Sequence, residues 1–185
     1  IFMRTFRTRH SQRQLSLGYN IIEVRRRLQP EFTGLPQREI NEMIWAKGKE
    51  QVAEEFEKII FSYGGDSRPI DPAQVAESLF LCHECTYMHH EDDERNFQQH
   101  SYLEEVLVMA AAAKVENLLL FHTSLRYNLD EIRQQLDEGI ARIKPGCRIL
   151  VLYGDSIFDT ASPQSWRKRI HREKAREKAL GEQSE

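Results

Sequence analysis

Short apolar runs alternate with amphipathic stretches along the chain, and several of the runs stop at an ionisable residue. Residues 59–63 are β-branched or aromatic and predict a buried strand that Gly64 and Gly65 end, with Asp66 directly after it. Apolar runs at 79–82 and 118–121 predict strands that end in the same way, before Glu84 and His122. Strand-end loops often carry chemistry in α/β proteins, although an ordinary turn also explains Asp66 alone.

The remaining pattern predicts further strands, helices and loops. Strands are expected at 1–9, 16–24 and 148–153, helices at 37–47, 71–78, 101–114 and 129–143, and loops at 25–36 and 88–99. Gly18 is a candidate bulge, and Ser101 is expected to cap its helix with Glu104 as the reciprocal acid. The alternation predicts an α/β fold, with one domain over 1–160 and a charged helical tail over 161–185.

Composition narrows the class of protein. The 185 residues carry 26 basic and 29 acidic side chains, so no global positive field predicts a nucleic-acid partner. Arg25, Arg26 and Arg27 form a local basic cluster that favours RNA over a small substrate, and the basic half of the tail more simply forms a solvated helix face. The sequence has no apolar run of membrane-spanning length, and its first residues contain no signal-peptide h-region. Three cysteines do not make a secreted disulfide framework, so we expect a soluble, intracellular protein without a membrane partner.

Strand-end loops of an α/β sheet gather at one edge, which can bring together side chains that are far apart in sequence. The candidates are His10, Asp66, Glu84, His100 and His122. Imidazole nitrogens and a carboxylate suit zinc, and a carboxylate can bridge two metals. Two metals can support phosphodiester cleavage. A structural zinc site at Cys82 and Cys85 is the weaker alternative, because only Cys147 remains as a third thiol.

The order of five motifs resembles the C-terminal half of ribonuclease Z, the tRNA 3′-processing branch of the metallo-β-lactamase superfamily. The resemblance covers about residues 3–130. The motifs are Arg-His10 with Leu17-Gly18-Tyr19, Gly65-Asp66-Ser67-Arg68-Pro69, His83-Glu84-Cys85-Thr86-Tyr87, His100-Ser101-Tyr102 and His122-Thr123-Ser124-Leu125-Arg126-Tyr127. The resemblance implies the C-terminal half of a metallo-β-lactamase αββα sandwich.

The resemblance also implies a role for each candidate residue. His10 and His122 match histidines that each bind one zinc, and Asp66 matches the aspartate that bridges the two ions. Glu84 and His100 match a pair in which the imidazole assists proton transfer to the leaving oxygen. Precursor tRNA is the implied substrate and a homodimer the implied assembly, while manganese can use the same ligands as zinc.

The sequence departs from the family pattern in one important respect. The family takes most of its metal ligands from a His-x-His-x-Asp-His motif in the N-terminal half, and this sequence contains none. With three ligands for two metals we expect weak zinc binding by this chain, which is then a C-terminal fragment or a degenerate relative. Some bacterial members place a long flexible exosite arm between the metal-binding histidine and the bridging aspartate. In this sequence only residues 25–57 are available for such an arm. The expected function is a zinc-dependent tRNA 3′-end endonuclease completed by the missing half; the alternatives are a hydrolase of another ester or phosphodiester and an inactive interaction module.

Overall fold

A single mixed sheet organises the fold. The computed structural model describes residues 1–11, 15–89, 99–162, 164, 166 and 170. Seven strands follow one another across the sheet in chain order. They are β1 (Phe2–Thr8), β2 (Ser16–Leu28), β3 (Ala53–Tyr63), β4 (Leu81–Glu84), β5 (Asn117–Phe121), β6 (Arg148–Tyr153) and β7 (Ser156–Asp159). The strands β3 to β6 are parallel, whereas β1, β2 and β7 join them by antiparallel pairing.

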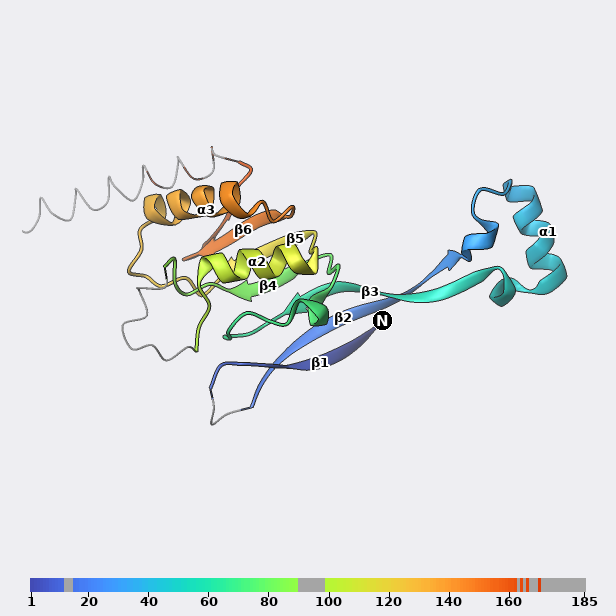
Figure 1. Cartoon of the computed structure of the whole chain (residues 1–185), viewed down its shortest axis with the longest axis horizontal. Coiled ribbons are helices and arrows are strands. Elements are labelled where there is room, and N and C mark those ends of the chain that lie inside the picture. The colour runs from blue at the N-terminus through green and yellow to red at the C-terminus, as the bar shows by residue number, and fades with distance from the viewer. Residues whose placement is uncertain (12–14, 90–98, 163, 165, 167–169, 171–185) are drawn as a thin grey trace, which may run out of the picture.

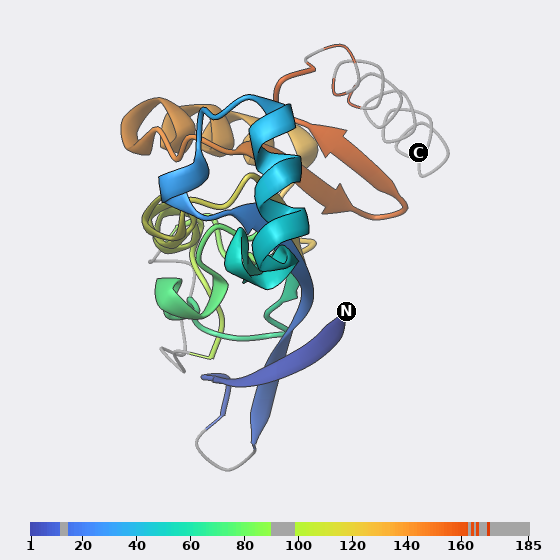
Figure 2. The same ribbon diagram turned by 90° about the vertical axis from the view of Figure 1, so that its right-hand side faces the viewer.

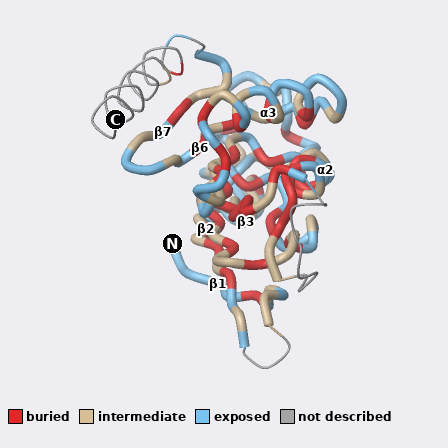
Figure 3. Tube along the Cα trace, turned by 90° about the vertical axis from the view of Figure 1, so that its left-hand side faces the viewer, coloured by how far each residue is buried: buried red, intermediate tan, exposed pale blue. Residues whose placement is uncertain are grey.

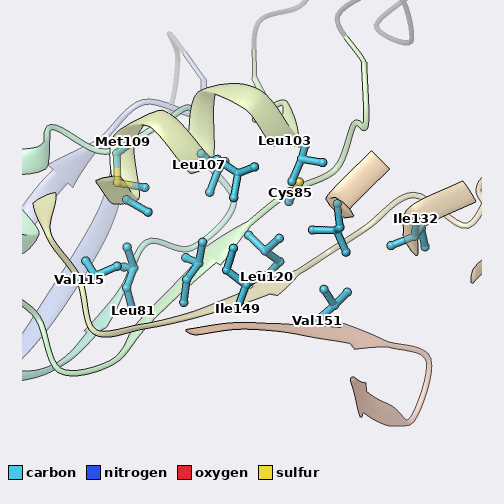
Figure 4. Close-up of a cluster of buried hydrophobic side chains, with 14 of the residues drawn as sticks. Leu81, Cys85, Leu103, Leu107, Met109, Val115, Leu120, Ile132, Ile149 and Val151 are labelled. Atoms are coloured by element: carbon cyan, nitrogen blue, oxygen red, sulfur yellow. The ribbon is translucent and has the colours of Figure 1, made fainter. Parts of the chain in front are cut away.

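Two helices cover one face of this sheet, as Figure 1 shows. They are α2 (Leu103–Ala113) and α3 (Leu129–Ile143), and their apolar sides meet the alternate strand residues that point toward them. Figure 4 shows Leu103 and Leu107 of α2 facing Leu120 and Ile149 across this core. Trp166 is also buried there, and its indole Nε1 donates to the carbonyl oxygen of Asp159. In Figure 3 the buried segments gather where the strands face these helices.

The opposite face of the sheet is apolar and has no helix over it within the described residues. Phe61 stacks on Phe80 with ring centroids 6.2 Å apart, and Tyr63 stacks on Phe121 at 5.4 Å. These rings are partly exposed, and Ile157 on β7 is 59% exposed. An apolar sheet face of this kind is where a second layer packs in two-layer folds.

A long arm projects from the sheet (Figure 1). It consists of the outer parts of β2 and β3, and it ends in α1 (Gln37–Lys47) between the 3₁₀ turns η1 (Pro30–Phe32) and η2 (Lys49–Gln51). Phe32, Ile40 and Val52 form a small core of its own at the tip. Figure 2 looks along the arm with α1 nearest the viewer.

The predicted loop at 25–36 is wrong for residues 25–28, which continue β2. Arg26 pairs with Glu55 and Arg27 with Glu54 across the two strands of the arm, with the closest N–O distances 2.7 Å. Arg25 also forms an ion pair, with Glu23. The basic cluster is therefore neutralised by neighbouring carboxylates.

Several other local predictions are confirmed. The α1 and α3 helices have the predicted bounds, and α3 begins with a capping box in which Asn128 and Glu131 exchange hydrogen bonds.

The segment predicted to be helical at 71–78 is the shorter turn η3 (Pro72–Val75), and Asp71 caps it by accepting from the backbone N–H of Ala73. Within the described part of the chain, no helix is both long enough and apolar enough to cross a bilayer.

Other local predictions are wrong. The register shift in β2 lies between Ile21 and Ile22, not at Gly18; Gly18 instead lies where any Cβ would fall 2.5 Å from the ring of Phe6. The hairpin that adds β7 was not predicted, and the strand expected at 79–82 is displaced to Leu81–Glu84. Most of the predicted loop at 88–99 and of the tail at 161–185 lies outside the described residues.

Candidate active site

The C-terminal ends of four strands meet at one edge of the sheet. Asp66 follows β3, Glu84 ends β4 and His122 follows β5, and these three strands are parallel neighbours. Two antiparallel steps make β1 parallel to β3, so the loop that carries His10 reaches the same edge. The backbone N–H of Arg68 donates to the carbonyl oxygen of Arg9 at 2.6 Å, which ties this loop to the one that carries Asp66.

Glu84 lies at the centre of the loops that meet at this edge. Its side chain is fully buried, and both carboxylate oxygens accept hydrogen bonds. Oε1 accepts from the backbone N–H groups of Ser67 at 3.2 Å and Ser101 at 3.0 Å, while Oε2 accepts from the N–H of Thr86 at 2.9 Å and its hydroxyl at 2.8 Å. One buried carboxylate thus joins three loops.

This arrangement explains why the predicted cap of α2 is wrong. Tyr102, not Ser101, precedes the first turn of α2, and no side chain caps it. The Ser101 backbone N–H serves Glu84, and its hydroxyl donates to the carbonyl oxygen of Ser67 at 2.7 Å. Ser101 therefore joins the candidate site to the neighbouring loop.

His100 lies against the same carboxylate. Its Nδ1 is 3.1 Å from Oε1 of Glu84, and the imidazole is mostly buried. Because an ionised carboxylate only accepts, Nδ1 carries the proton in this contact. The centroid of the His100 ring lies 5.1 Å from that of His10 and 5.3 Å from that of His122. Three imidazoles therefore gather at one place.

Asp66 and His122 face each other at the open side of the site. Oδ2 of Asp66 is 3.6 Å from Nε2 of His122, and both side chains are nearly half exposed. His122 has a φ of 60°, in the left-handed region that residues with a Cβ seldom adopt. An observed outlier of this kind supports a functional hypothesis for the residue.

The donor set fits a divalent metal in part. The Nδ1 of His10 lies 3.2 Å from the carbonyl oxygen of Gln99, so the proton resides on Nδ1 and the lone pair on Nε2. Imidazole nitrogens and the Asp66 carboxylate are ligand types that zinc uses. However, the compact group of candidate ligand atoms, all within 4.8 Å in the described parts of the chain, is Glu84, His100 and His122. His10 and Asp66 lie outside that group.

Glu84 is poorly suited to be a metal ligand, even though it belongs to this compact group. Its two oxygens already accept four hydrogen bonds from Ser67, Ser101 and Thr86, besides the contact with His100. A metal ion bound to Glu84 would break these hydrogen bonds and leave buried backbone N–H groups without an acceptor, which is costly in free energy. The contacts therefore favour a positioning role for Glu84.

The alternative zinc site at the cysteines has little support. Burial raises the pKa of the Cys82 thiol to about 11, and burial next to Glu84 raises the pKa of Cys85 as well. Protonated thiols are poor ligands. Neither cysteine belongs to a group of three candidate ligands among the residues that the structure describes.

Three residues of this edge contact Glu84 in a way that the sequence did not predict. Ser67 and Ser101 contribute backbone donors to Glu84, and Thr86 contributes both a backbone and a hydroxyl donor. The hydroxyl of Thr86 also lies 3.0 Å from Nδ1 of His122. For Ser67 and Thr86, a small polar residue a few positions after a strand end was the available signal, whereas Ser101 lies shortly before α2.

Comparisons with known proteins agree on the fold and on the sequence resemblance. No family model matches the chain. The ribonuclease Z of Ignicoccus hospitalis is 31% identical over 123 residues, which are 59% of this chain and 39% of the relative. The ribonuclease Z of Thermococcus gammatolerans is 39% identical over 71 residues, 37% of this chain and 22% of the relative. The chain thus spans well under half the length of these relatives.

A solved structure with the same fold is the metallo-β-lactamase fold protein YhfI from Bacillus subtilis. It superposes with a TM-score of 0.50 at 13% identity and covers 85% of this chain and 48% of its own length. This likeness confirms the predicted fold class, an α/β chain equivalent to about half of a metallo-β-lactamase fold. The chain is therefore similar in sequence to part of ribonuclease Z, and it has the metallo-β-lactamase fold.

Proposed function

We propose that this chain supplies one side of a metal-dependent phosphodiesterase site that cleaves precursor tRNA at its 3′ end, as the ribonuclease Z resemblance implies. The observation that carries the proposal is the meeting of Asp66 with His122 and of Glu84 with His100 at one edge of the sheet. The first pair offers metal ligands on the open side. The second pair offers a proton donor that a buried carboxylate orients.

In this proposal His10, Asp66 and His122 would hold two zinc ions, with Asp66 as the shared ligand that the resemblance implies, and manganese could use the same ligands. The ions would acidify a water molecule and neutralise charge on the scissile phosphodiester. His100 donates a proton to the leaving oxygen. Glu84 accepts from Nδ1 of His100, which holds the ring and stabilises its charged form.

Two observations support a second half that completes the site. The three proposed ligands are fewer than a two-metal centre needs, and zinc binds poorly to an incomplete set. The sheet face opposite α2 and α3 is also apolar, with Phe61, Phe80 and the strongly exposed Ile157. A second sheet packed on this face would bury these side chains and bring further ligands to the same edge.

The proposal is tested with the chain joined to a half that carries a His-x-His-x-Asp-His motif. With zinc, the joined protein should cut precursor tRNA, and Asp66→Ala should abolish cutting. Asp71→Ala is the matched control, because Asp71 only caps a 3₁₀ turn and should leave the rate unchanged. Cutting by the Asp66→Ala protein at the normal rate would refute the role of Asp66.

One observation favours a second candidate, a hydrolase of a small ester or phosphodiester. The arginines that could have favoured RNA are paired with carboxylates, so the arm has no open basic patch at Arg25, Arg26 and Arg27. A joined protein that hydrolyses bis(p-nitrophenyl) phosphate but leaves precursor tRNA intact would support this candidate. Inactivity toward both substrates would support the non-catalytic module.

The homodimer and the intracellular location belong to the same proposal. All three cysteines are free thiols, which fits a reducing compartment. Light scattering on the joined protein should give twice the monomer mass. A monomeric active enzyme would remove the dimer from the account without touching the site.

A further inference from the structure

Thr86 forms a contact that the proposed reaction does not use. Its Oγ1 lies 2.8 Å from Oε2 of Glu84 and 3.0 Å from Nδ1 of His122, so one hydroxyl connects the buried carboxylate with an imidazole on the open side of the site. Thr86 itself is buried. A hydroxyl has a single proton, so its two contacts must differ in direction.

The chemistry of Glu84 fixes that direction. Its oxygens already accept from three backbone N–H groups, those of Ser67, Thr86 and Ser101, and these require an acceptor. Because a carboxylate only accepts hydrogen bonds, the hydroxyl of Thr86 donates its hydrogen bond to Oε2 of Glu84. Oγ1 then has only lone pairs to offer to His122, so Nδ1 of His122 must carry a hydrogen and donate it.

Backbone hydrogen bonds hold the two partners in place. The N–H of Cys85 donates to the carbonyl oxygen of Phe121 at 2.8 Å, and the N–H of Ser124 donates to the carbonyl oxygen of Thr86 at 3.1 Å. These bonds lie directly beside the hydroxyl–imidazole contact, before and after His122 in the chain. The contact is therefore built into the pairing of the two loops.

We propose that Thr86 is a positioning residue that fixes the tautomer of His122. Its hydroxyl donates to Glu84 and therefore accepts a hydrogen bond from Nδ1 of His122, which relays the effect of the carboxylate to the imidazole. A neutral His122 with hydrogen on Nδ1 presents the lone pair of Nε2, the atom that lies 3.6 Å from Oδ2 of Asp66. Glu84 orients His100 by the direct contact with its Nδ1. One buried carboxylate thus sets the hydrogen positions of two imidazoles, one directly and one through Thr86.

The effect of this tautomer on metal affinity rests on the proposed function, because it requires His122 to be a metal ligand. The tautomer itself does not depend on that function. If His122 is a ligand, a fixed Nε2 lone pair raises metal affinity, and outer-sphere partners of this kind typically contribute about 10–100-fold. Without a metal, the 3.0 Å contact with Thr86 still selects the tautomer, because the 3.6 Å between Nε2 and Oδ2 of Asp66 is beyond hydrogen-bond distance. The two statements can therefore fail separately.

The test is ¹⁵N NMR of the histidine side chains in the metal-free chain, at a pH where the imidazoles are neutral. His122 should show a protonated Nδ1 and an unprotonated Nε2, and Thr86→Ser, which keeps the hydroxyl, should leave this pattern unchanged. Thr86→Val keeps the β-branched shape and removes the hydroxyl, so it should shift His122 toward the Nε2–H form. His100 should not change in either variant.

Two results would overturn the proposal. One is an Nε2–H tautomer of His122 in the unaltered chain, which needs no variant and so does not depend on the folding of Thr86→Val. The other is an unchanged His122 pattern in a folded Thr86→Val protein. In the joined, zinc-binding protein, Thr86→Val should weaken zinc binding about 10–100-fold relative to Thr86→Ser. Equal affinities together with the predicted tautomer change would refute the metal role of His122 and leave the relay intact.

Discussion

Exchanging the buried carboxylate of Glu84 for an amide should destabilise the protein strongly although the two side chains have the same shape. In Glu84→Gln the amide oxygen can replace only one of the two acceptors. If it takes the position of Oε1, the amide nitrogen faces the backbone N–H of Thr86, which then has no acceptor. The opposite orientation removes the acceptor of both Ser67 and Ser101, which costs more.

The magnitude follows from these contacts. A buried N–H without an acceptor costs about 1–3 kcal/mol, and hydrogen bonds to a charged group contribute about 1 kcal/mol more than those to a neutral one. Three bonds remain in the better orientation, from Ser67, Ser101 and His100, and each loses the charge. The expected loss in free energy of unfolding is therefore about 4–6 kcal/mol.

Urea unfolding followed by circular dichroism measures this loss. Glu104→Gln is the matched control, because Glu104 forms an exposed ion pair with Arg142 at 2.9 Å and exposed pairs contribute about 1 kcal/mol or less. A loss for Glu84→Gln that is no larger than the loss for Glu104→Gln would refute the role of Glu84 as the centre of the site.

Three further predictions concern other parts of the molecule. Iodide should quench the fluorescence of Trp45, which is 90% exposed, and Trp45→Phe should leave the unquenched, blue-shifted emission of Trp166, which is 1% exposed; strong quenching in Trp45→Phe would contradict the burial. Arg26→Ala should lower the free energy of unfolding in urea by less than about 1 kcal/mol, because its pair with Glu55 is solvent-exposed, and a larger loss would contradict this. Because burial raises the pKa of Cys82 to about 11 while the unfolded thiol ionises near 9, stability should fall as pH rises through that window. The fall should be smaller in Cys82→Ala, and an equal fall would contradict the burial effect.

Local signals in the sequence were sufficient for some elements. Asn128 and Glu131 form a capping box that depends only on residues three apart, so the start of α3 could be predicted. The stop of α1 at Gly48 likewise depends on a residue with φ of 90°, which glycine adopts easily. Strand ends at Asp66 and His122 were visible because apolar runs stop there.

Other features depend on partners far away in the chain, which a single sequence does not display. Arg26 continues a strand because it pairs with Glu55, 29 residues later, and its isolated composition resembles a loop. Ser101 resembles a helix cap by sequence, but Glu84 and Ser67 hold its donors instead. The relay through Thr86 needs two strand ends side by side, so it becomes visible only in three dimensions.

The central claim is that Asp66 and His122 belong to one metal site that a second half completes. Zinc content after equilibrium dialysis tests it most directly, in the chain joined to a half that carries the His-x-His-x-Asp-His motif. The account predicts about two zinc ions per joined chain, and no more than one after Asp66→Ala, because the carboxylate proposed as their shared ligand is gone. Two tightly bound zinc ions in the Asp66→Ala protein would contradict it.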